Sequence, residues 1–230
     1  MHYFRTYILI LLCLSTITLS SLAQPKLLRE EMYVGAQAGA MASMVNFTPD
    51  VSQSPLHSMP GVTGGAVFRY IGHKVCGLQV EVNYMQRGWQ EYDKSAGNGY
   101  LRQLNYIEVP MLMHLYFGDK ARGFFNLGPQ IGYLIQEKQS NIPSIYSAAW
   151  DSGKGSGTYH QYVPVENKFD WGVAGGLGFY YRTPRAGTYQ LEARFNYSLG
   201  CIFSTSKMDY FSYSNNMNLS LCFAYMWQVK

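Results

Sequence analysis

The sequence predicts an all-β fold: an eight-stranded antiparallel transmembrane β-barrel with an up-and-down meander. Three observations lead there. The last segment, 216–230, alternates throughout between apolar residues and small or polar ones, whereas an ordinary globular strand has about 5–6 residues and a bilayer-crossing strand needs about 9–11. Seven earlier segments alternate in the same way. Charged residues are only 14% of the chain and aromatic residues 16%, against about 25% charged residues in a soluble domain.

The first four strands are predicted at 32–44, 62–71, 75–88 and 101–117. Small residues fill both faces of the first. In the second, alanine, phenylalanine and tyrosine alternate with valine and arginine. Leucine, valine and tyrosine alternate with glutamine, glutamate, asparagine and arginine in the third. Aliphatic residues alternate with tyrosine, glutamate, proline and histidine in the fourth. Most of these strands therefore have one face suited to lipid and one suited to a narrow interior.

The last four strands are predicted at 123–136, 169–182, 188–203 and 216–230. Large apolar side chains alternate with asparagine, glutamine and glycine in the fifth, and with glycine and alanine in the sixth. Tyrosine, leucine and phenylalanine alternate with glutamine, glutamate, arginine and asparagine in the seventh. The eighth repeats the pattern, with its aromatic residues gathered toward the end of the chain.

The connections between the strands alternate in length. Tight turns are expected at 72–74, 118–120 and 183–187, and longer polar loops at 45–61, 89–100 and 137–167, with a further loop before the last strand. Bacterial barrels have short periplasmic turns and longer outer loops, so both termini are expected in the periplasm. Aromatic residues are expected as girdles at the two interfaces: Tyr70, Tyr116, Tyr181, Tyr189 and Trp227 at the periplasmic end, and Trp89, Trp171 and Phe203 at the outer end.

A soluble barrel of the lipocalin type is the alternative, with apolar residues inside and polar residues outside. A period of two does not say which face points inward. The polar faces here are rich in glycine, alanine, serine and asparagine, as a narrow interior requires. A soluble exterior would carry many lysines and glutamates, so the membrane barrel is favoured.

The N-terminus predicts export. Residues 1–23 have a weakly positive start, an apolar core and small residues before Gln24, as in a cleaved signal peptide. The barrel domain is then 24–230, and its expected location is the outer membrane. A net charge of +4 with scattered basic residues does not indicate nucleic acid. Because no Cys or His residues have metal-ligand spacing, we expect neither metal nor cofactor.

Charged residues on the predicted inner face are candidate site residues: Arg69, Glu81, Arg87, Glu108, Glu192 and Arg194. Isolated charges inside a closed barrel are costly and must pair. We expect Arg69 near Glu81, and Arg87 or Glu81 near Glu108. Either the network is a structural plug or it lines a gated ion path. An eight-stranded interior is just wide enough for side chains, which favours the plug.

Catalytic residues are not expected, since His114 lies at the periplasmic end and no motif joins His57 or His160 to a nucleophile. Partners are expected to be outer-membrane lipid and other envelope or secretion proteins. The longest loop is a candidate binding surface because exposed aromatic side chains make good contacts; the residues concerned are Tyr146, Trp150, Tyr159 and Tyr162.

The fourth and fifth strands contain Tyr106-Ile107-Glu108-Val109-Pro110-Met111 and Asn126-Leu127-Gly128-Pro129-Gln130. These motifs resemble the PorT-like outer-membrane β-barrel family of Bacteroidota, and the similarity extends over the mature chain. The resemblance implies an eight-stranded outer-membrane barrel, and some relatives are linked to protein export. One departure is the ending Trp227-Gln228-Val229-Lys230, where such barrels commonly finish on an aromatic residue.

Three functions remain open at this point. The first is a non-enzymatic envelope component, structural or accessory to protein export. The second is a surface-binding protein or adhesin acting through its outer loops. The third and weakest is a lipid-modifying outer-membrane enzyme.

Overall fold

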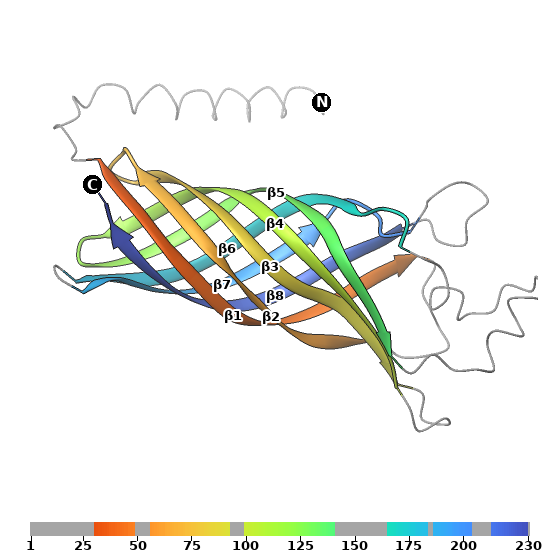
Figure 1. Cartoon of the computed structure of the whole chain (residues 1–230). Helices are drawn as coiled ribbons and strands as arrows, with labels where there is room; N and C mark the ends of the chain where they lie inside the picture. The colour runs from red at the N-terminus through yellow and green to blue at the C-terminus, as the bar shows by residue number, and fades with distance from the viewer. Residues whose placement is uncertain are drawn as a thin grey trace, which may run out of the picture.

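The computed structural model describes residues 30–48, 56–92, 99–140, 165–183, 186–203 and 213–229. These residues form eight strands in one closed antiparallel barrel, in which each strand pairs with the next and β8 pairs with β1 (Figure 1). The predicted fold class is therefore confirmed. The strands are β1 (Glu31–Thr48), β2 (Leu56–Ile71), β3 (Cys76–Tyr92), β4 (Gly99–Gly118), β5 (Ala121–Ser140), β6 (Phe169–Thr183), β7 (Gly187–Ser198) and β8 (Tyr213–Gln228).

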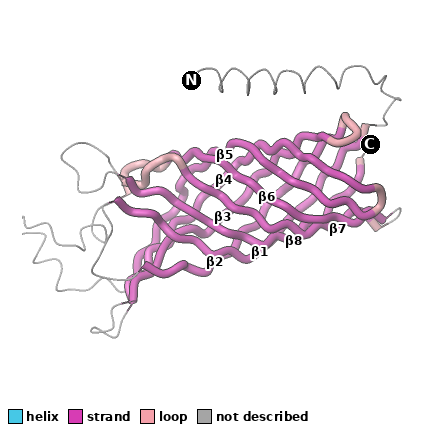
Figure 2. The backbone as a smooth tube through the Cα atoms, turned by 180° about the vertical axis from the view of Figure 1, so that it is seen from behind, coloured by secondary structure: helices cyan, strands magenta, loops and turns pink. Residues whose placement is uncertain are grey.

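The strand ends that the short connections join lie at one end of the barrel: Ile71 and Cys76, Gly118 and Ala121, and Thr183 and Gly187. The C-terminus lies at the same end, as both views show (Figures 1 and 2). Gly118 and Gly187 have φ values of +105° and +79° at two of these turns. Residues with a Cβ rarely adopt such angles, so glycine suits these positions. Within the described ranges, no helix is long and apolar enough to cross a membrane.

The outward face of the barrel is apolar. Large side chains on it are half exposed in the isolated chain, such as Val82 at 51%, Leu177 at 65% and Leu221 at 55%. Their neighbours one residue away point inward and are buried, among them Glu81 and Ser220. This is the inside-out pattern of a barrel that faces lipid, and it decides against the lipocalin-type alternative.

Several strands run further than the sequence predicts. β1 continues to Thr48 and β2 begins at Leu56, while β3 and β4 extend into the segment expected as a polar loop at 89–100. Ladder pairs such as Trp89 with Arg102 and Gln90 with Leu101 hold this extension. Polar composition indicated a loop there, but the outer ends of the strands continue beyond the length that a bilayer requires.

The predicted aromatic girdles are confirmed in part. Trp171, Tyr181, Tyr189 and Trp227 lie on the exposed outer face, but Trp89, Phe203 and Tyr116 are buried in the interior. Phe203 was expected within the seventh strand, which in fact ends at Ser198. Beyond it the Leu199 N–H donates to the Trp171 carbonyl at 2.8 Å and the Ile202 N–H to the Ser214 carbonyl at 2.9 Å. The chain therefore leaves the wall there, and Phe203 is buried with the inner residues.

Candidate functional site

The barrel interior is the candidate site that the described residues form. All six predicted interior charges are buried, with exposed fractions of 3% or less. Five of them, all except Arg69, belong to two ion-pair groups. In one, Arg194 of β7 lies between Glu81 and Glu192; in the other, Arg87 of β3 binds Glu108 and Asp170.

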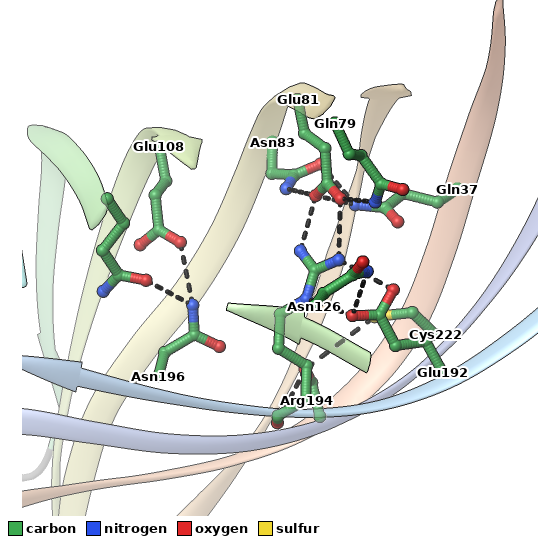
Figure 3. A network of polar contacts seen from close by, with 12 residues as sticks. Gln37, Gln79, Glu81, Asn83, Glu108, Asn126, Glu192, Arg194, Asn196 and Cys222 are labelled. Atoms are coloured by element: carbon green, nitrogen blue, oxygen red, sulfur yellow. Dashed lines mark hydrogen bonds and ion pairs between the residues drawn. The ribbon is translucent and has the colours of Figure 1, made fainter. Parts of the chain in front are cut away.

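The central group spans the lumen (Figure 3). β3 and β7 stand on opposite sides of the ring, yet Arg194 donates through Nη1 and Nη2 to the two Glu81 oxygens at 2.5 and 2.7 Å. Arg194 also donates to Glu192 through Nε and Nη2, both at 2.9 Å. A bidentate guanidinium–carboxylate pair is the strongest kind of charged hydrogen bond. It ties opposite walls of the barrel together.

Amide side chains complete the central group. Glu81 accepts from Gln37 of β1 and from Asn83, each at 2.7 Å, and from Gln79. Glu192 accepts from Gln190 at 3.0 Å and from Asn126 of β5 at 3.1 Å. These donors compensate part of the solvation that the carboxylates lose on burial. The cluster therefore links β1, β3, β5 and β7.

The second group lies nearer the ends that carry the long connections. Arg87 pairs with Glu108 of the adjacent β4 and, at 2.7 Å, with Asp170 of β6. Asp170 also accepts from the Ser198 hydroxyl at 2.6 Å. Asn196 donates to Glu108 at 3.0 Å. The expected Arg87–Glu108 pair is confirmed, while Asp170 was missed although it shares a face with the small inward residues of β6.

The predicted pair between Arg69 and Glu81 is wrong. The antiparallel register places Gln79 opposite Arg69 and Val67 opposite Glu81. Arg69 donates from Nε to the Gln79 oxygen at 2.7 Å and from Nη2 to Gln190 across the lumen. Its guanidinium lies 5.0 Å from the Tyr180 ring centroid, close enough for a cation–π interaction.

Apolar clusters close both ends of this polar centre. Toward the long connections, the outer cluster comprises Val45, Phe47, Trp89, Tyr100, Leu104, Tyr106, Leu134, Val165, Ile202 and Phe203. Phe47 and Trp89 meet edge to face at 5.3 Å, and the Arg102 guanidinium lies 5.5 Å from the Trp89 centroid. Toward the short turns, the inner cluster comprises Tyr33, Val67, Ile71, Tyr116, Phe124, Tyr180 and Met226. The lumen is therefore filled in three layers.

His114 belongs to the layer near the short turns. Its ring packs 5.1 Å from the Phe124 centroid, 5.7 Å from Tyr116 and 5.8 Å from Tyr180. Its Nδ1 lies 2.7 Å from the Asn126 oxygen. The histidine is thus packed among aromatic rings and held by an amide, an arrangement that serves packing.

The remaining predictions concern other parts of the chain. Among the described residues no group of His, Cys, Asp and Glu could hold a metal, and Cys76, Cys201 and Cys222 carry free thiols. The proposed signal peptide at 1–23 lies outside the described residues, as does the aromatic loop surface. That surface comprises Tyr146, Trp150, Tyr159 and Tyr162.

Comparison with known proteins supports the fold. A family model described as the outer membrane protein beta-barrel domain matches residues 22–204. No protein of curated function is significantly similar in sequence.

Among solved structures, OprG from Pseudomonas aeruginosa is similar at 13% identity, covering 86% of this chain and 95% of that one, with a TM-score of 0.49. Ail of Yersinia pestis is similar at 15% identity, covering 86% of this chain and 99% of that one, with a TM-score of 0.43. The outer membrane enzyme PagL is similar at 9% identity, covering 81% of this chain and 98% of that one, with a TM-score of 0.39. Likenesses at this level carry no argument about function.

Proposed function

Because this chain belongs to the outer membrane protein beta-barrel domain family, we propose that it is a sealed, non-enzymatic barrel, a structural or accessory component of the envelope. Its partners are outer-membrane lipid and other envelope or secretion proteins. Nucleic acid is not among them.

The observation that carries the proposal is the filled lumen. An eight-stranded barrel has room for little more than its own side chains. Here Arg194 binds Glu81 from the opposite wall, so these charges neutralise each other inside the lumen. Apolar clusters lie on both sides of the network. Such an interior favours a rigid plug over an ion path.

The finer assignment is to the PorT-like barrels of Bacteroidota, with a role in protein export. It is supported by the motif at 106–111, whose Tyr106 and Glu108 point into the plug while Ile107 and Met111 lie on the outer face. The Arg87 guanidinium lies over the Tyr106 ring, 5.2 Å from the ring centroid, and Glu108 pairs with Arg87. The motif thereby maintains the interior, and export would depend on surfaces outside the lumen.

A deletion strain tests the export role. Secreted and periplasmic proteins are compared between the parent, the deletion and the deletion complemented with the full chain. Cargo that accumulates in the periplasm of the deletion and is released on complementation supports the role. An unchanged secretome would refute it and leave the envelope-structural role.

Absence of catalysis is part of the same proposal. His114, a buried histidine of β4, contacts an amide and three aromatic rings, and a catalytic base needs a reacting group within reach. Lipid A from the deletion strain is therefore expected to be unchanged by mass spectrometry. A lipid A species that changes on deletion and returns on complementation would contradict this.

Surface binding through the outer loops is the second candidate. The connection between β5 and β6 contains Tyr146, Trp150, Tyr159 and Tyr162, and tyrosine and tryptophan are enriched at binding hot spots. Replacing residues 141–164 with a glycine–serine linker should abolish an adhesion phenotype while the barrel still assembles. Adhesion that persists in this variant would show that the loop is not the binding surface.

A further inference from the structure

A pocket of about 430 Å³ opens at the rim that carries the short turns. The turn between β4 and β5 and the adjoining ends of β6, β7 and β8 form it. The Arg182 N–H donates to the Lys120 carbonyl at 3.0 Å, which joins the turn to β6. Its lining includes the side chains of Lys120, Tyr181, Arg182, Thr183, Thr188 and Trp227.

The pocket has a positive lining. Two lining side chains, Lys120 and Arg182, are cationic, and among the described residues that line it none is acidic. Arg182 contacts Glu31 at 2.7 Å, but that carboxylate is shared with Arg122 at 3.0 Å. One negative charge thus serves two guanidinium groups. Asp119, in the same turn as Lys120, is not among the lining residues.

Aromatic residues border the same pocket on the lipid side. Tyr181 is 51% exposed and Trp227 60% exposed on the outer wall, and Trp227 meets Tyr225 edge to face at 5.3 Å. Tyrosine and tryptophan gather at the level of the lipid headgroups. Short turns face the periplasm in bacterial barrels, so this pocket lies at the headgroup level of the periplasmic leaflet.

We propose that this pocket binds the phosphate of an anionic glycerophospholipid of the periplasmic leaflet. Lys120 and Arg182 bind the phosphate oxygens, and the Trp227 ring covers the glycerol and the start of the acyl chains. The volume suits a small ligand, since ligand pockets measure about 300–1,000 Å³. The rings on the lipid side favour a lipid over free phosphate. The site is independent of the sealed lumen and of any role in export.

The test uses the full chain refolded into nanodiscs of phosphatidylcholine with a minor fraction of phosphatidylglycerol of the same acyl chains. Bound lipid is counted by native mass spectrometry. The variants are Lys120→Gln, the double variant Lys120→Gln/Arg182→Gln, and the control Lys74→Gln, which removes an exposed lysine from another short turn. Unheated gel migration shows that each variant has folded.

The wild type is expected to retain phosphatidylglycerol in preference to phosphatidylcholine. A cation near an anionic lipid surface contributes about fivefold in affinity, so Lys120→Gln should lose about fivefold and the double variant about 25-fold. Lys74→Gln lies at the same rim but outside the pocket, so it should lose less than Lys120→Gln; an equal loss would show a general surface-charge effect and would overturn the proposal. Equal retention by the wild type and both pocket variants, or no preference between the two lipids, would overturn the proposal.

A second arm separates the lipid from free anion. Excess inorganic phosphate is added to the same nanodiscs, and the bound phosphatidylglycerol is counted again. Retained lipid supports the proposal, because the acyl contacts with Trp227 add to the phosphate contacts. If inorganic phosphate alone displaces the lipid, the pocket is a free-anion site and the lipid assignment is wrong.

Discussion

Replacing Arg194 with methionine should destabilise the barrel strongly. The substitution keeps an unbranched side chain of smaller volume but removes the cation that pairs with Glu81 at 2.5 Å and with Glu192 at 2.9 Å. Both carboxylates are buried to within 1% exposure. Removing one partner of a buried pair costs about 3–5 kcal/mol, because an uncompensated charge remains. We expect about 4 kcal/mol, since amide donors still hold each carboxylate.

The assay is urea unfolding of the full chain in lipid bilayers, with Trp fluorescence and gel migration as probes. Lys138→Met removes an exposed cation at the end of β5 and should change the free energy of unfolding by about 0.5 kcal/mol or less. The variant Arg69→Met/Glu81→Gln/Glu192→Gln/Arg194→Met should recover most of this loss, because Arg69, the other buried cation beside these carboxylates, is removed as well and no charge remains unpaired. A loss below about 1 kcal/mol for Arg194→Met alone would refute the account of the central group.

Three further substitutions test other layers of the barrel by the same unfolding measurement. Leu221→Arg, on the outer face of β8, should cost about 2–4 kcal/mol in bilayers if it lies near the midplane; an unchanged free energy would mean that this face does not meet lipid. Trp89→Ala should cost about 3–5 kcal/mol, because the side chain is fully buried in the outer cluster, and a loss typical of a surface residue would place it outside the core. Gly187→Val at φ +79° should cost about 1–2 kcal/mol, and wild-type stability would show that the turn can relax.

Residue alternation in the sequence predicts which side chains face inward because a strand has a period of two. Glu81, Glu108 and Glu192 were assigned in this way, and all three are buried. Alternation says nothing about which inward residue meets which across the lumen. The partner of Glu81 lies on β7, more than a hundred positions away in the chain, and only barrel closure brings it near.

The sequence did not predict the outer cluster for a different reason. Trp89 and Tyr100 flank a polar segment, so composition predicted a loop, but the strands continue and point both rings inward. Phe203 was assigned to the wall by extending the alternation of β7 past Ser198. Alternation shows where a strand has a lipid face, but it does not show where the chain leaves the wall.

Conductance of the full chain in planar lipid bilayers tests the central claim most directly. The account predicts no steps above the baseline for the wild type, because ion pairs and two apolar clusters fill the lumen. A variant that removes side chains from each layer, Trp89→Ala/Arg194→Ala/Phe124→Ala, serves as the positive control if it folds. Stable, ion-selective steps from the wild-type barrel would contradict a sealed interior and restore the ion path.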